Sequence, residues 1–134
     1  MSLLIKGGGG ASTIHLLTAL EYVFDGGMVT LAGHPFGYLR VPFAGTIQSV
    51  SMFADAEPTL FNVDILKCAY ADFPDGLSSI VGGTYPELAG SKSMEDGTLS
   101  GWETSFDADD IFAFSVQNTD TIALVTIVLK VLRS

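Results

Sequence analysis

The residues that could carry out catalysis are few. His15 and His34 are the only histidines, and Cys68 is the only cysteine. A Ser-His-Asp site needs a serine beside a histidine that a carboxylate orients, and neither histidine lies in a nucleophile-elbow sequence. We expect Cys68 to be a small buried residue rather than a reactive thiol. These residues therefore predict that the protein is not an enzyme.

The sequence also lacks a complete ligand set for a metal or a cofactor. Asp107, Asp109 and Asp110 form the densest carboxylate group, but the glycine and the closing glutamate of an EF-hand loop are missing. We interpret this group as an acidic turn. Two histidines without spaced cysteines do not predict a zinc site. The Gly7–Gly10 tract lacks the Lys-Ser/Thr pair of a phosphate-binding loop and is interpreted as a linker. No metal and no cofactor is expected.

The composition indicates a globular domain with more apolar surface than one core can hide. Of the 134 residues, 48% are hydrophobic and 16% are charged, and the mean hydropathy is +0.43. The longest apolar run, 121–132, is too short for a transmembrane helix, so no membrane is expected as a partner. The net charge of −9 and six scattered basic residues argue against nucleic-acid binding. The N-terminus lacks the features of a secretory signal. An apolar surface of this kind predicts a homo-oligomer.

The order of turns and apolar runs predicts an all-β fold, an antiparallel β-sandwich. Residues 1–12 are expected to form a flexible N-terminal arm, and 13–134 a single sandwich domain. Residues 13–24 fit either a helix or a strand, with strand slightly favoured near 21–24 because a turn signal follows. The remaining expected strands are 37–43, 46–54, 61–68, 78–81, 97–104, 111–117 and 121–132.

Alternation along these strands predicts which residues form the core and which lie outside it. The expected core residues are Phe61, Val63, Ile65, Phe112, Phe114, Val125, Ile127 and Leu129. The opposite side of the last strand is too apolar for open water, so it is interpreted as part of a subunit contact. The candidate interface residues are Leu66, Ile122, Leu124 and Val128. Tyr70, Tyr85 and Trp102 are candidate glycan contacts, with packing at the core rim as the alternative.

From about Glu21 to the C-terminus, the chain resembles a jelly-roll-like β-sandwich module of tailed-phage virion proteins, of the tail-fibre, baseplate or capsid-decoration type. The residues that carry the resemblance lie in the expected order over about 80% of the chain. They are Phe24–Gly27, Val41–Ile47, Val63–Lys67, Phe73–Pro74, Ile80, Pro86–Leu88, Lys92–Ser93, Leu99–Trp102, Asp109–Phe114 and Val125–Val131. Asp109 departs from the pattern, because members of this family more often place glycine before the aspartate.

The resemblance implies a non-enzymatic structural protein that decorates the capsid or forms part of the tail or fibre surface. Its expected location is the virion, assembled in the host cytoplasm. The expected partners are other copies of the chain, with a trimer as the first hypothesis, and other virion proteins. The alternative is a carbohydrate-binding, receptor-binding module whose partner is a surface glycan.

Overall fold

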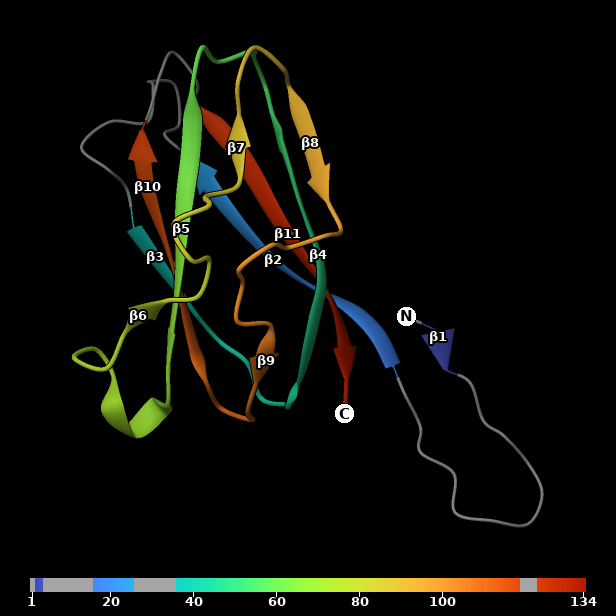
Figure 1. Ribbon diagram of the computed structural model, residues 1–134, viewed down its shortest axis with the longest axis vertical. Helices are drawn as coiled ribbons and strands as arrows, with labels where there is room; N and C mark the ends of the chain where they lie inside the picture. Colours follow the sequence, from blue (N-terminus) through green and yellow to red (C-terminus); the bar gives the residue numbers. More distant parts are fainter. Residues whose placement is uncertain (1, 4–15, 26–35, 119–122) are drawn as a thin grey trace.

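The computed structural model describes residues 2–3, 16–25, 36–118 and 123–134. They form two antiparallel sheets that face each other (Figure 1). Sheet A contains, in order, β1 (Ser2–Leu3), β2 (Leu16–Asp25), β11 (Leu124–Arg133), β4 (Gly45–Ala54) and β8 (Ser93–Asp96), and β9 (Ser105–Phe106) also pairs with β4. Sheet B contains β3 (Phe36–Arg40), β10 (Ile111–Asn118), β5 (Phe61–Cys68) and β6 (Ser78–Ser79), and β7 (Glu87–Leu88) also pairs with β5. The expected antiparallel β-sandwich is confirmed.

The strand pairs nest inside one another along the sequence. β2 pairs with β11, β3 with β10, β4 with β8, and β5 with β6, and every pair is antiparallel. The chain therefore behaves like a long hairpin that is rolled up so that successive pairs alternate between the two sheets. This is the jelly-roll-like arrangement.

The core lies between the sheets and has the composition that alternation predicted. All eight expected core residues are fully buried. Aromatic rings cross the layer: Tyr22 of β2 stacks on Phe114 of β10 at 5.3 Å, and Phe106 meets Phe112 edge-on at 5.4 Å. Such ring pairs join the sheets because each ring buries a large area and prefers these geometries.

Residues 13–24, for which the sequence left helix and strand open, form a strand over the part that the structure describes. This strand is β2, which pairs with β11 over its whole length. Leu20 and Phe24 are buried and Leu17 and Val23 exposed, as a two-residue period requires. Of the expected arm, only Ser2 and Leu3 are described, and they pair with Leu17 and Leu16.

The prediction of a strand at 97–104 is wrong. β8 ends at Asp96, whose Oδ1 accepts a hydrogen bond from the Thr98 N–H at 2.8 Å and starts a turn. Leu99 and Gly101 then adopt positive φ angles of 51° and 79°, which a strand does not permit. The short strand β9 follows at Ser105. An aspartate side chain that bonds its own backbone two residues on therefore ends the ladder.

Several strand ends also differ from expectation. β3 ends at Arg40, before the non-donating Pro42, and β6 contains only Ser78 and Ser79 of the expected 78–81. The last strand begins at Leu124, while 121 and 122 lie outside the described residues. The short helix η1 (Tyr70–Asp72) follows β5 and projects from one end of the sandwich (Figure 1).

Candidate interaction surfaces

Two of the three carboxylates of the 107–110 turn, those of Asp109 and Asp110, bind groups of this chain. Asp110 is buried, and its Oδ2 accepts a hydrogen bond from the Asp107 N–H at 2.9 Å. Asp109 has a positive φ of 71° and pairs with Arg40 at 3.2 Å. Within the part of the chain that the structure describes, no group of three His, Cys, Asp or Glu side chains could hold a metal ion. Both histidines lie outside the described residues.

Cys68 ends β5 and is buried. Burial raises the pKa of its thiol, and the nearby carboxylates of Asp72 and Asp110 raise it further. A raised pKa lowers the thiolate fraction at neutral pH, and the thiolate is the nucleophilic form. The environment of Cys68 therefore disfavours its use as a nucleophile.

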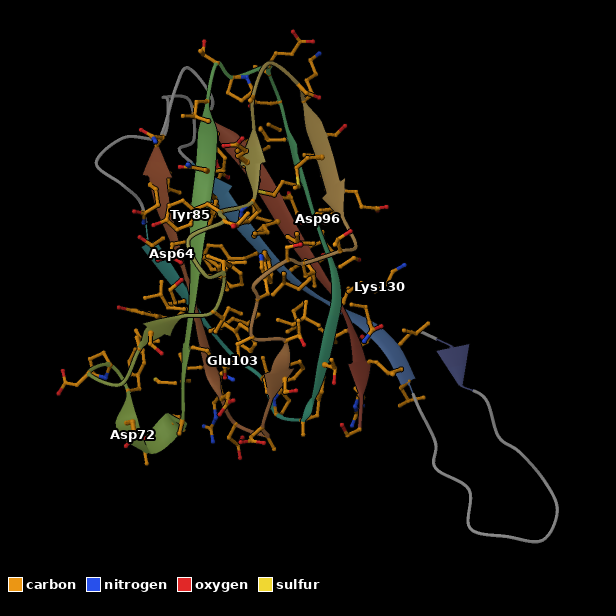
Figure 2. All side chains as sticks on the ribbon, in the orientation of Figure 1. Asp64, Asp72, Tyr85, Asp96, Glu103 and Lys130 are labelled. Atoms are coloured by element: carbon orange, nitrogen blue, oxygen red, sulfur yellow. The ribbon has the colours of Figure 1, made fainter. Side chains whose placement is uncertain are left out.

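The three candidate glycan contacts do not form one platform. Tyr70 lies in η1 beyond the end of β5, whereas Tyr85 lies beside Pro86, whose carbonyl accepts the Val63 N–H near the start of that strand. Val63 and Cys68 are five residues apart, which is about 16 Å along a strand. Tyr85 and Trp102 are half-buried against the core, and Figure 2 shows Tyr85 in front of β5, far from Asp72 of η1.

The candidate interface residues divide between the two sheets. Leu124 and Val128 lie on the outer face of β11, as alternation predicted. Leu66 lies on β5 in sheet B, opposite Ala113 and Ser79, so it belongs to the other side of the molecule. Ile122 lies outside the described residues. The four residues therefore do not share one surface.

Leu124 and Val128 belong to a larger apolar surface, which we call the sheet A face. Cross-strand neighbours place Val23, Thr126 and Phe53 in one row over β2, β11 and β4, and Leu17 lies beside Leu132 at the far end. A shallow hollow in this face is lined by Leu17, Thr18, Ala19, Glu21, Val128 and Lys130. Four of the exposed large apolar side chains in the described residues lie here: Leu17, Val23, Phe53 and Leu124.

Sequence reasoning missed three members of the sheet A face. Leu17 and Val23 were not assigned to a face because helix and strand both remained open for 13–24. Phe53 was missed because the register of β4 against β11 shifts between Lys130 and Val131. An extra residue of this kind moves every later side chain to the opposite face, so simple alternation along 46–54 gives no continuous outer row.

The remaining exposed large apolar side chains gather on sheet B and the adjoining loop. They are Tyr38, Tyr70 and Phe73. The Tyr38 ring meets the Phe73 ring at 4.8 Å and 89°, and the Arg40 guanidinium lies 4.0 Å from the centre of the Tyr70 ring. The described residues therefore expose large apolar side chains in two separate places, one on each sheet.

Comparisons with known proteins give no family for this chain. No family model matches, and no curated protein sequence is detectably similar. Solved structures with a similar fold include a chain of the capsid of Ralstonia phage GP4 (9% identity, TM-score 0.48, 88% of this chain and 84% of that chain). They also include a chain of the cyanophage Pam1 capsid (16% identity, TM-score 0.47, 97% and 91%). A further one is the CBM32 of AlyQ in complex with 4,5-unsaturated mannuronic acid (11% identity, TM-score 0.45, 84% and 76%). At TM-scores below 0.5, these likenesses assign neither a family nor a function.

Proposed function

We propose that this chain is a non-enzymatic structural protein of a phage particle, and that its copies contact one another through the sheet A face. The observation that carries the proposal is the apolar surface over β2, β11 and β4, with four exposed large side chains. Val23, Phe53 and Leu124 lie in neighbouring rows of this face, and contiguous exposed apolar surface on a small domain marks an interaction site. The phage role rests on the sequence resemblance, and it covers either capsid decoration or part of the tail or fibre surface.

The charges on the sheet A face favour a second copy of the chain as its occupant. Glu21 lies opposite Val128, and Lys130 lies opposite Ala19, so one carboxylate and one ammonium group occupy the next two rows, between the Val23–Thr126–Phe53 row and Leu17. The same face on another copy supplies the opposite charge for each. Figure 2 shows Lys130 pointing away from the sandwich. Such pairs fix the orientation of two surfaces more than they add affinity.

The proposed number of copies is three, and other virion proteins are the proposed further partners. The number follows by analogy from the threefold positions that are common in capsids and fibres, and not from any feature of the described residues. The proposed location is the virion, after assembly in the host cytoplasm. Among the described residues there is no helix of the length and apolar character needed to cross a membrane.

The carbohydrate-binding alternative lacks support from the exposed rings that the structure describes. A flat sugar platform needs ring faces that lie in one plane, whereas Tyr38 and Phe73 are perpendicular. The third exposed ring, that of Tyr70, is covered on one face by the Arg40 guanidinium, so this face is not open to a sugar. We therefore place the structural role first.

Analysis of purified particles tests the phage role. Particles from a lysate of the host that carries this coding sequence are purified by density gradient, and their proteins are counted by mass spectrometry. We expect this chain in many copies per particle, comparable to the other surface proteins. Its absence from particles whose capsid and tail proteins are all recovered would contradict the proposal.

A further inference from the structure

A second cluster of exposed aromatic side chains lies on sheet B and on the loop that contains η1. We define the η1 patch as Tyr38 of β3 together with Tyr70, Asp72, Phe73 and Asp75 of the loop that follows β5. Tyr38 and Tyr70 are 50% and 56% exposed, and Phe73 is also exposed. Exposed tyrosine and other aromatic side chains in one cluster are the composition of interface hot spots. The patch is independent of the sheet A face and of the proposed function.

The loop that carries the patch is held in one conformation by its own backbone. The Asp72 N–H bonds the Ala69 carbonyl at 3.0 Å, and the Gly76 N–H bonds the Asp72 carbonyl at 2.7 Å. Gly76 is required here, because a Cβ at this position would lie 2.7 Å from the Cβ of Asp72. The edge-on contact of Phe73 with Tyr38 then ties the loop to sheet B. A partner would meet a surface that needs little ordering, which lowers the entropic cost of binding.

The patch combines aromatic rings with negative charge. Its hollow is lined by Ala71, Asp72, Phe73, Asp75 and Gly76, and Figure 2 shows Asp72 at the projecting end of the molecule. Neither Asp72 nor Asp75 has an ion-pair partner among the described residues. The sequence from 68 to 91 contains no lysine or arginine. The preceding Lys67 is already bound to Glu103 Oε1 at 3.0 Å and to the Ser105 carbonyl at 2.7 Å.

The neighbouring Arg40 shows which chemistry this surface accepts. Its guanidinium lies over the Tyr70 ring at 4.0 Å while it pairs with Asp109 at 3.2 Å. A positive group is thus held by one aromatic face and one carboxylate, which is a favourable combination for a guanidinium. Phe73 together with Asp72 and Asp75 offers the same combination of an aromatic ring and carboxylates. Among the described residues, no lysine or arginine forms an ion pair or a cation–π contact with these three side chains.

We propose that the η1 patch binds an arginine- or lysine-bearing segment of another protein. The aromatic rings receive the stem and the charged head of the basic side chain, and the two carboxylates pair with its charge. Charge complementarity selects this partner: the ion pairs of the described residues do not involve the two carboxylates of the patch, and the chain as a whole has a net charge of −9. An acidic or nucleic-acid partner is repelled by the same charges.

The test is an NMR titration of the ¹⁵N-labelled full chain with the peptide acetyl-Gly-Arg-Gly-Arg-Gly-amide. We expect chemical-shift changes that concentrate at Tyr38 and at residues 70–76. The double variant Asp72→Asn/Asp75→Asn should weaken binding at least about fivefold, and Tyr38→Ala should weaken it by a similar factor. The Asn variants keep the shape of exposed side chains, so they report on binding even if Tyr38→Ala perturbs the fold.

The matched control is Glu57→Gln/Glu95→Gln, which removes the same charge from two exposed positions outside the patch. This variant should bind the peptide within about twofold of the unmodified chain, because only the long-range field changes. The proposal is overturned if the arginine peptide causes no shifts at the patch, or if the control weakens binding as much as the patch variant. It is also overturned if the same peptide with glutamate in place of arginine, or a neutral oligosaccharide, binds these residues equally well.

Discussion

Charge substitution in the sheet A face should separate the copies of this chain while leaving each copy folded. Val23 and Phe53 are the most informative positions, since they lie in one row on either side of Thr126 and are 50% and 53% exposed in the single chain. Exposed substitutions cost a folded monomer little, typically within about 0.5 kcal/mol plus the weak strand propensity of aspartate. The variant Val23→Asp/Phe53→Asp is therefore expected to fold.

The cost to the assembly is much larger. Full burial of a valine or phenylalanine contributes about 1.5–3 kcal/mol, so the half that is still exposed contributes roughly 1 kcal/mol for each residue on association. A carboxylate placed in a dry contact adds a desolvation penalty of several kcal/mol. A loss of at least about 3 kcal/mol raises the dissociation constant more than about a hundredfold.

Sedimentation equilibrium at tens of micromolar measures this difference directly. The matched control is Tyr38→Asp, which makes the same kind of change at a residue of sheet B that is equally exposed. We expect the double variant to sediment as a monomer and the control to retain the mass of the unmodified chain. The reasoning is refuted if the double variant remains assembled with unchanged circular dichroism, or if the Tyr38→Asp control dissociates to the same extent.

Three further outcomes are expected. Leu124→Asp/Val128→Asp should also dissociate the assembly, measured by size exclusion with light scattering; an unchanged mass would remove β11 from the contact. Phe114→Ala should lower the free energy of unfolding by about 3–5 kcal/mol in urea denaturation, because the fully buried ring leaves a cavity beside Tyr22; a loss below about 1 kcal/mol would contradict the core packing. Because burial and then Asp72 and Asp110 raise the pKa of Cys68 in the folded chain, stability should be lost as the pH rises above about 8.5, the pKa of an unfolded thiol. The unmodified chain should therefore lose more stability than Cys68→Ala between about pH 8.5 and about pH 10. The free energy of unfolding is measured by urea denaturation at each pH, and an equal decrease with pH for the two chains would contradict this.

The core could be predicted from the sequence because it depends on a local rule. Phe61, Val63 and Ile65 point inward for the same reason that every second residue of a half-buried strand does. The two-sheet class also followed from the turn residues between short apolar runs. Neither inference requires knowledge of which strand lies beside which.

The strand partners and surface clusters could not be predicted, because they depend on contacts between residues far apart in the sequence. Tyr38 and Phe73 are separated by 34 intervening residues and meet only through the pairing of β3 with β10 and of β10 with β5. Alternation places Leu66 on the outer face of its strand, as it does Leu124 and Val128, yet the strand of Leu66 lies in sheet B and theirs in sheet A. The bulge in β4 that turns Phe53 outward leaves no residue signature in 46–54 that alternation could detect.

The central claim is that the sheet A face is a contact between copies of this chain. Light scattering after size exclusion of the unmodified chain at tens of micromolar tests it most directly. A chain has a mass of 14.1 kDa, so the proposed trimer predicts three times that mass, about 42 kDa. A measured mass near 14 kDa would show that this face is an apolar surface without a second copy, and the account of self-assembly would be wrong.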